Sequence, residues 1–316
     1  MKKHYLFTVI TLLGGALLFQ AKARTPQIGL PISEAPRIAY VMRVSSGINS
    51  IRSIKQDGTD DQDLWGTPTP IGTFRSLAFT PDGQTMIYSN TEGIYSQERG
   101  RPAKRILTTP AGSLHVSPDD RKLVYTIVAT TPRPHSEIFT SSLDGRVVQR
   151  LTTDDEENVA SPSWSPRSDK IIYSSGGGLQ LKVMNADGSG KSVLPIVPRS
   201  PSEAIPGLSV PQWSPNGKAI VAIGNHENSV THLYIMNADG TGFHPITVEP
   251  LRRGFVRWSP DGTKLLFAGR RATLDEVPWD IFTINSNGTG PVNVTHTTTA
   301  SEIHPQWLVP RPPKTP

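Results

Sequence analysis

The sequence has 316 residues, a formal net charge of +5 and no cysteine. Charged residues make up only 19% of the chain, whereas glycine and proline number 27 and 29, a balance that favours short strands and many turns. The lack of cysteine excludes disulfides, lipid attachment through an N-terminal cysteine and cysteine nucleophiles. No basic tract suggests nucleic-acid binding.

The first residues predict an export signal. Lys2 and Lys3 precede an apolar run from Tyr5 to Phe19, and Ala21-Lys22-Ala23 supplies a small-x-small cleavage pattern. The run is too short for a membrane-spanning helix. We therefore expect residues 1–23 to be a signal peptide and the mature chain, with a charge of about +2, to be periplasmic or secreted without a membrane anchor. Residues 24–36 should be a disordered leader.

One turn recurs along the rest of the chain at intervals of 37 to 49 residues. Its copies are Thr80 to Gly83, Ser117 to Asp120, Ser165-Pro166, Ser214 to Gly217, Ser259 to Gly262 and the diverged Trp307 to Pro310. Ser or Thr, Pro, Asp and Gly suit successive positions of a type I turn, so each copy predicts a β-hairpin. A period of this length indicates a propeller blade or a solenoid unit.

A second turn in each period predicts the remaining strands. Strands rich in apolar residues follow the first turn, and later ones run into Asp187-Gly188, Asp239-Gly240 and Asn287-Gly288. A brief fourth strand ends the period. Four antiparallel strands per period correspond to one blade of a β-propeller.

The two ends of the series predict how the ring closes. Ile38 to Arg43 and Ile51 to Lys55 resemble second and third strands, but no first strand precedes them. Glu302 to Trp307 has the first-strand pattern without a second strand after it. We expect an all-β, six-bladed propeller over residues 37–310, closed by pairing of its N- and C-terminal strands and followed by a tail at 311–316.

The repeat resembles a known family. Trp258 to Gly262 reads Trp-Ser-Pro-Asp-Gly, and Ile235 to Gly240 reads Ile-Met-Asn-Ala-Asp-Gly. Both are similar to the TolB-type (PD40, WD40-like) propeller repeats of bacterial envelope proteins, and the resemblance extends from Arg37 to Pro310. It implies a propeller that acts as a binding or scaffold protein in the envelope, although a shared fold alone does not determine function.

An aromatic residue recurs at one point of the repeat, immediately before the first turn. Its copies are Phe79, Trp164, Trp213, Trp258 and Trp307. Large rings at such a position are suited to sealing the seams between neighbouring blades. We predict that this series belongs to the core and not to a ligand site.

The motifs favour a binding protein over an enzyme. No Gly-x-Ser-x-Gly elbow is present, so no catalytic serine is predicted. Asn185 to Gly190 imitates the start of a calcium loop, but Ile196 stands at the twelfth position, where a bidentate glutamate belongs. We therefore expect no catalytic residue, no metal and no cofactor.

The alternative hypothesis is a lyase acting on acidic oligosaccharides. Propellers related by the same resemblance include pectic-oligomer lyases, which use His and Gln as metal ligands and His as a general base. An arginine would then neutralise a uronate carboxylate while a histidine removes the adjacent proton. This requires a metal or an Arg–His cluster in the channel, with at least three of His226, His232, His304 and Gln306 converging on the metal.

The long connections offer the clearest indication of a binding face. Connections after the second and fourth strands are long and varied, and they should emerge on the same rim, where variable loops on a rigid frame carry function. The charged candidates on this rim are Glu156, Glu157, His226, Arg252, Arg253, Arg270 and Arg271. The arginines would bind carboxylates of an envelope protein partner, or of an acidic glycan, through bidentate hydrogen bonds. Solvated loops without a partner are the simpler interpretation.

Overall fold

The computed structural model describes residues 36–44, 49–65, 74–129, 135–153, 158–226, 230–247, 251–271 and 278–309. The side chains of Val44, Leu251 and Arg271 are not among those described. The predicted signal peptide, nearly all of the leader and the tail also lie outside these ranges. Within the described part, strands dominate and the one helix is a single 3-10 turn, η1 (Gly176–Gly178). No helix in this part is long and apolar enough to cross a bilayer.

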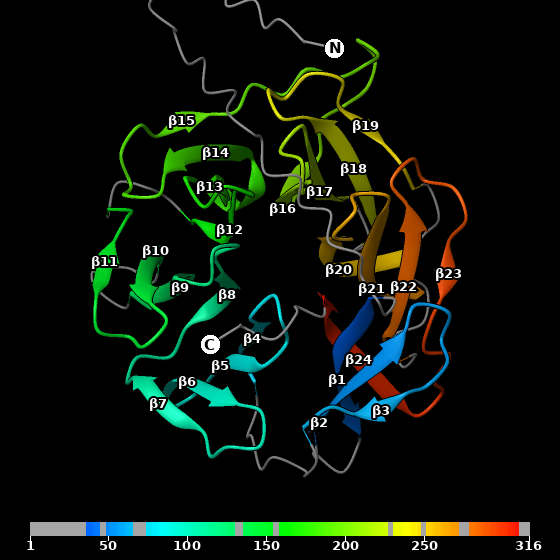
Figure 1. The fold of residues 1–316 in the computed structure, drawn as a ribbon. Helices are drawn as coiled ribbons and strands as arrows, with labels where there is room; N and C mark the ends of the chain where they lie inside the picture. Colours follow the sequence, from blue (N-terminus) through cyan, green and yellow to red (C-terminus); the bar gives the residue numbers. More distant parts are fainter. Residues whose placement is uncertain are drawn as a thin grey trace, which may run out of the picture. The chain divides into compact units, whose positions relative to one another are not determined.

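The strands form six four-stranded antiparallel blades (Figure 1). Blade 1 contains β4 (Ser76–Phe79), β5 (Thr85–Asn90), β6 (Gly93–Glu98) and β7 (Lys104–Leu107). Blade 2 contains β8 (Gly112–Val116), β9 (Lys122–Ala129), β10 (His135–Ser142) and β11 (Val148–Arg150). Blade 3 contains β12 (Ala160–Trp164), β13 (Lys170–Ser175), β14 (Gln180–Asn185) and β15 (Ser192–Val193).

The second half of the ring is built in the same way. Blade 4 contains β16 (Gly207–Trp213), β17 (Ala219–Asn225), β18 (Thr231–Asn237) and β19 (His244–Pro245). Blade 5 contains β20 (Leu251–Trp258), β21 (Lys264–Arg271), β22 (Asp280–Asn285) and β23 (Val292–Asn293). Blade 6 contains β24 (Ala300–Leu308), β1 (Arg37–Val44), β2 (Asn49–Lys55) and β3 (Gln62–Asp63). A short pairing of β18 with β20 also joins blades 4 and 5.

The first strand of every blade lies nearest the axis of the ring (Figure 1). These inner strands contact one another in the order β4, β8, β12, β16, β20, β24 and back to β4. The cycle is therefore closed, and the blades radiate from the axis as the repeat predicted.

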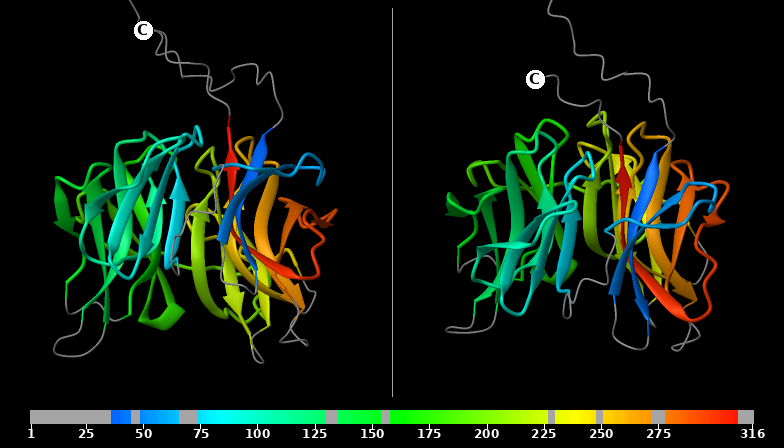
Figure 2. Two further views of the ribbon diagram at one scale, coloured as in Figure 1. Left: turned by 90° about the horizontal axis from the view of Figure 1, so that it is seen from below. Right: turned by 60° about the horizontal axis from the view of Figure 1, so that its bottom comes forward.

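Blade 6 combines both ends of the series. Strand β24 pairs antiparallel with β1, in a register that runs from Arg37 opposite Leu308 to Val44 opposite Ala300. Figure 2 shows the two strands, red and blue, side by side. The predicted closure is confirmed, because the first strand of this blade comes from the end of the chain and the other three come from its beginning.

The recurring turn has the predicted hydrogen bonds. In blade 1, the amide of Gly83 donates to the carbonyl of Thr80 at 2.8 Å. The Thr80 hydroxyl donates to Asp82 at 2.6 Å, and Gly83 takes a φ of 66°, which favours glycine. Each turn residue thus has a specific role in connecting an inner strand to the next strand of its blade.

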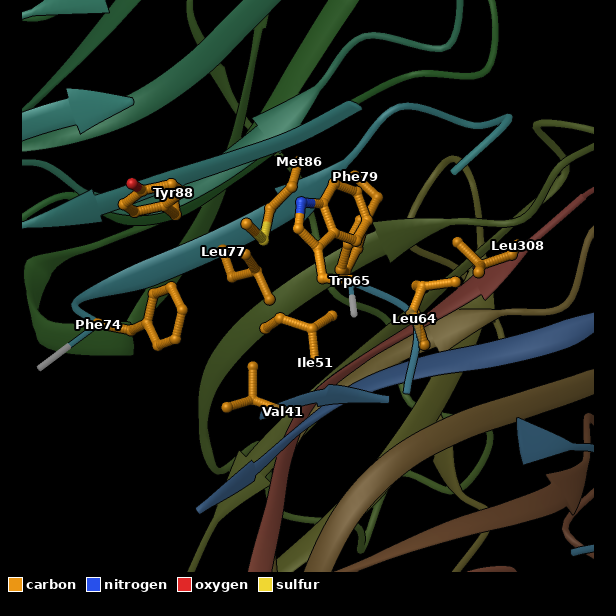
Figure 3. Close-up of a cluster of buried hydrophobic side chains, with 11 residues drawn as sticks. Val41, Ile51, Leu64, Trp65, Phe74, Leu77, Phe79, Met86, Tyr88 and Leu308 are labelled. Carbon is orange, nitrogen blue, oxygen red and sulfur yellow. The ribbon is translucent and has the colours of Figure 1, made fainter. Parts of the chain in front are cut away.

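The hydrophobic core is divided among the seams between blades. Six buried clusters are present, one for each seam. Figure 3 shows the cluster between blades 6 and 1, where Val41 and Ile51 of blade 6 face Leu77, Phe79 and Met86 of blade 1. Burial of apolar surface therefore stabilises each blade only against its neighbours.

The aromatic series lies in these seams, as predicted. Phe79, Trp164 and Trp307 are buried in three different clusters. Trp213 and Trp258 are half-buried against two more clusters. The prediction that these rings belong to the core is confirmed.

Five of the six inner strands carry a β-bulge at the same place. The bulged residue lies three positions before the residue that ends the strand in four of these strands and four positions before it in β24, and its φ is between 49° and 58° in every case. These residues are Ser113, Ser161, Val210, Phe255 and His304. A bulge bends the strand and changes the direction of nearby side chains, so the bulges help to set which side chains reach the axis.

Candidate binding sites on the rim and at the axis

Two of the predicted docking arginines lie side by side on the rim where second and fourth strands end. Arg252 is at the beginning of β20, Arg270 is near the end of β21, and the two residues pair in register. Both side chains are half-buried. The guanidinium of Arg270 lies over the ring of Trp279, 5.3 Å from its centroid, in a cation–π contact. This arrangement holds the positive charge close to an aromatic surface.

Arg253, between these two in the predicted set, has a structural position. Its side chain is 5% exposed, and its guanidinium donates to the carbonyl of Thr231 in blade 4. Its amide donates to the Thr231 hydroxyl at 2.6 Å, and the guanidinium lies 5.7 Å from the Phe267 ring centroid. Arg253 therefore connects blades 4 and 5 and is not part of the exposed surface of the rim.

His226 lies next to this region, on the rim of blade 4. It is exposed, and its Nε2 is 3.0 Å from the Tyr234 hydroxyl. The ring of His232 is 4.7 Å away. Burial lowers the pKa of His232, and the nearby charges of His226 and Arg253 lower it further. The two histidines therefore belong to the same electropositive region as the arginines.

We call the exposed or half-buried members of this region the rim patch. They are His226, His232, Arg252, Arg270 and Trp279. The other predicted members, Glu156, Glu157 and the side chain of Arg271, lie outside the described residues, so the expected opposition of an acidic and a basic sector stays a prediction.

A second group of polar side chains lines the axis. In two inner strands, the residue before the one that packs into the seam at the strand end contacts the backbone of the next blade. The Gln306 amide oxygen accepts the Phe79 amide at 3.0 Å, and its nitrogen donates to the Phe79 carbonyl at 2.9 Å. In the same way, His115 Nδ1 accepts the Trp164 amide at 3.3 Å. These side chains supply acceptors to the inner edge of the following blade.

Arg257 occupies this position in blade 5 and cannot do the same, because a guanidinium has no acceptor. One of its nitrogens donates to the carbonyl of Val256 at 3.0 Å. Burial lowers its pKa to about 10, and no Asp or Glu of the described residues opposes that effect. A half-buried guanidinium without a carboxylate beside it is unusual, since buried charges are normally paired.

Two histidines share the electrostatic surroundings of Arg257. Burial first and then the charge of Arg257 lower the pKa of His115 to about 3. The pKa of His304 is also about 3, again through burial first and then through Arg257 and Arg43. The His304 ring centroid is 4.1 Å from that of Phe255. We call Arg257, His115, His304 and Phe255 the axial cluster.

Sequence reasoning missed Arg257 and His115, although a signal was present. Both precede the residue that ends an inner strand, in the same column of the repeat as Gln306. Comparing the residues at this position of the repeat from blade to blade would have identified Arg257 as the one side chain that can only donate.

The side chains required by the lyase hypothesis lie in three places. His226 and His232 are together on the rim of blade 4, His304 packs on Phe255 in the axial cluster, and Gln306 binds the backbone of Phe79. In the described part of the chain, no three His, Asp or Glu side chains form a group that could hold a metal. The predicted metal-binding set does not converge there.

Comparison with known proteins places the fold. No protein-family model matches the chain. A curated relative, the uncharacterised peptidase YuxL of Bacillus subtilis, is 36% identical over 56 residues, which are 18% of this chain and 8% of the relative. The chain thus spans only a small fraction of that protein.

Solved structures resemble the chain over most of its length. TolB from Acinetobacter baumannii has a TM-score of 0.69 at 20% identity and matches 86% of this chain and 66% of its own. A putative TolB from Agrobacterium tumefaciens has a TM-score of 0.61 at 14% identity and matches 87% of this chain and 99% of its own. An oligogalacturonate lyase in complex with manganese has a TM-score of 0.56 at 13% identity and matches 79% of this chain and 71% of its own. At these identities the likeness shows a TolB-like propeller fold.

Proposed function

We propose that this TolB-like propeller is an exported, non-enzymatic binding protein of the bacterial envelope that engages an acidic surface of a protein partner through the rim patch. The observation that carries the proposal is the position of Arg252 and Arg270, which are adjacent across two strands on the rim with the variable connections. Rigid strands fix both residues, so the patch is organised before a partner arrives.

The chemistry of the patch suits carboxylates. A guanidinium presents a planar fork of donors that matches a carboxylate in two parallel hydrogen bonds. Trp279 adds an aromatic surface beside Arg270, and Trp and Arg are the residue types enriched at energetic centres of protein interfaces. His226, exposed on the neighbouring blade 4, adds an imidazole that can donate or accept a hydrogen bond.

Export is the second part of the proposal. It is supported by the basic start, the apolar run and the small-x-small pattern of residues 1–23, and the absence of cysteine is compatible with an oxidising compartment. The likeness to TolB structures supports a periplasmic site of action.

A charge-reversal experiment tests the rim patch. Arg252→Glu/Arg270→Glu and wild-type protein would be used to capture partners from solubilised bacterial envelope, with a photo-crosslinker at position 226 to mark contact. We expect a protein that crosslinks to the wild type and is lost in the double variant. Arg253 is left unchanged, because its buried contact with Thr231 would confuse binding with folding.

Lys104→Glu/Arg105→Glu is the matched control, since both side chains are exposed on β7 of blade 1. It makes the same change in net charge far from the patch. A partner retained equally by both double variants would contradict the proposal, as would capture that does not weaken when salt is raised.

An acidic oligosaccharide is the alternative ligand, and a lyase is the alternative activity. The fold likeness to an oligogalacturonate lyase and the Arg–His group of the axial cluster support this alternative, whereas the scattered positions of His226, His304 and Gln306 favour binding without turnover. Incubation of the protein with manganese and oligogalacturonate, followed by ultraviolet detection of an unsaturated product, separates the two. Product formation would replace the binding proposal with the lyase.

A further inference from the structure

The axial cluster places an arginine at a position where two other blades place a hydrogen-bond acceptor. In blade 6, Gln306 accepts the amide of Phe79 in the following blade, and in blade 2, His115 accepts the amide of Trp164. The register of Trp307 against Ile38 gives its amide the same place as those of Phe79 and Trp164. The side chain that precedes it around the ring is Arg257, which can only donate.

Positive charge and donors therefore meet at the seam between blades 5 and 6. Arg257 uses one hydrogen bond, to Val256, and a guanidinium carries five N–H donors. Its charge is felt by His304 of blade 6 and by His115 of blade 2, on the other side of the axis. Among the described residues, no carboxylate lies close enough to influence Arg257.

The structure assigns to this place a second binding site, independent of the rim patch, for a carboxylate group of a ligand. Its oxygens would accept from the guanidinium of Arg257 and from the amide of Trp307, supplying the acceptor that Gln306 and His115 supply elsewhere. The ring of Phe255, 4.1 Å from that of His304, packs on the hydrophobic cluster that contains Trp307 and so supplies apolar surface at the same seam. A ligand that carries its carboxylate next to an apolar group fits this arrangement.

The neutral state of His115 and His304 is consistent with the binding of a carboxylate at this site. His115 accepts at Nδ1, so its proton is on Nε2 and is available as a further donor. A bound anion would offset the charge of Arg257 and raise the pKa of both histidines from about 3. Ligand binding therefore has a spectroscopic signature separate from any activity.

Titration with acetate followed by NMR tests the site. Protein labelled at tryptophan nitrogen and histidine carbon would be titrated with sodium acetate, replacing sodium chloride at constant ionic strength. We expect saturable shifts of the Trp307 amide and of the His304 and His115 ring signals. Arg257→Gln should weaken the apparent affinity by about tenfold or more, because a charge-assisted bidentate contact is lost.

Two further variants make the result specific. Arg99→Gln is the matched control, since Arg99 is exposed at the end of blade 1, and it should bind acetate as the wild type does. Arg257→Lys keeps the charge but lacks the planar fork, so it should bind more weakly than wild type and more tightly than Arg257→Gln. If circular dichroism shows that Arg257→Gln does not fold, the acetate affinity of Arg257→Lys compared with that of wild type tests the site instead.

Two peptides identify the source of the carboxylate. A short apolar peptide with a free C-terminus that competes with acetate, while its amidated form does not, indicates the terminus of a polypeptide. Acetate binding without such competition indicates a small free carboxylate. The assignment is overturned if chloride produces the same shifts, if Arg257→Gln binds acetate as wild type does, or if no shift saturates. Each result is independent of partner capture by the rim patch.

Discussion

Strand β20 carries two arginines in contrasting environments, Arg253 and Arg257, which are four positions apart. At its rim end, Arg253 is buried but donates to the carbonyl of Thr231 and lies over Phe267. At its axial end, Arg257 donates to the neighbouring Val256 carbonyl, and no described carboxylate accompanies it. The comparison teaches that the contacts of an arginine, and not its charge, indicate its role. Contacts across a seam indicate a structural role, whereas donors left over at a seam indicate a place for a ligand.

The largest effect is expected at a buried acid of blade 6. Glu302 of β24 is 0% exposed, its amide donates to the Trp279 carbonyl at 2.7 Å, and burial raises its pKa to about 7. The folded state therefore favours the protonated form. Its contribution to stability is full below pH 4.5, the ordinary value, and is lost as pH rises through about 7.

Glu302→Gln should remove this pH dependence. The variant should exceed wild type in free energy of unfolding by up to about 3 kcal/mol at pH 8 and match it near pH 4.5. Urea denaturation across that range measures the difference. Glu98→Gln, at an exposed pair with Arg101, is the control and should change little. Equal pH profiles for wild type and Glu302→Gln would show that Glu302 is not held protonated.

Arg253→Ala tests the structural side of the comparison. We expect a loss of about 2 kcal/mol in the free energy of unfolding, because the Thr231 carbonyl loses a charged donor between blades 4 and 5. Arg252→Ala, one residue earlier and half-buried, should change it by less than about 0.5 kcal/mol. Denaturant titrations that gave the two variants similar losses would remove the distinction between Arg253 and its neighbour.

Arg257→Met tests the axial side. A half-buried charge with no described carboxylate beside it gains little from its surroundings, so an apolar side chain of similar length should leave stability within about 1 kcal/mol of wild type or increase it. The pKa of His304 and His115 should rise from about 3 while staying below the ordinary 6.5, because burial remains. NMR titration of the ring signals measures both. A loss as large as that of Arg253→Ala would contradict the contrast.

The smallest effect concerns the rim patch itself. A double-mutant cycle between Arg270 and Trp279, with Arg270→Gln and Trp279→Leu, should give a coupling of about 0.5 to 1 kcal/mol for the cation–π contact. Denaturation of the four proteins supplies the cycle. Zero coupling would mean that the patch is not organised before binding.

The sequence predicted the architecture well because its turns are chemically explicit. Proline, aspartate and glycine at fixed positions, as in Thr80 to Gly83, determine where one strand ends and the next begins. The missing first strand before Ile38 then required a partner from the other end of the chain, and β24 is that partner.

The candidate sites were less predictable, for two physical reasons. Arg253 and Arg252 are adjacent in sequence, yet only the three-dimensional register places Arg253 against Thr231. The bulges at Phe255 and His304 involve residues that do not signal a left-handed backbone, and they set the direction of the axial side chains. Arg257 could have been identified as a candidate site residue from the sequence, but only by comparing equivalent positions of the repeats and not by searching for charged residues.

The closure of blade 6 also determines the order in which the blades can fold. Blades 1 to 5 use consecutive strands and can assemble in the order of synthesis, whereas β1 to β3 must wait for residues 300–308. Until then, β1 exposes a free sheet edge, and pairing across such a sequence separation is slow and prone to aggregation. A protein that travels across a membrane unfolded would therefore complete its ring only after its last strand had arrived, which makes the final step of folding coincide with the end of transport.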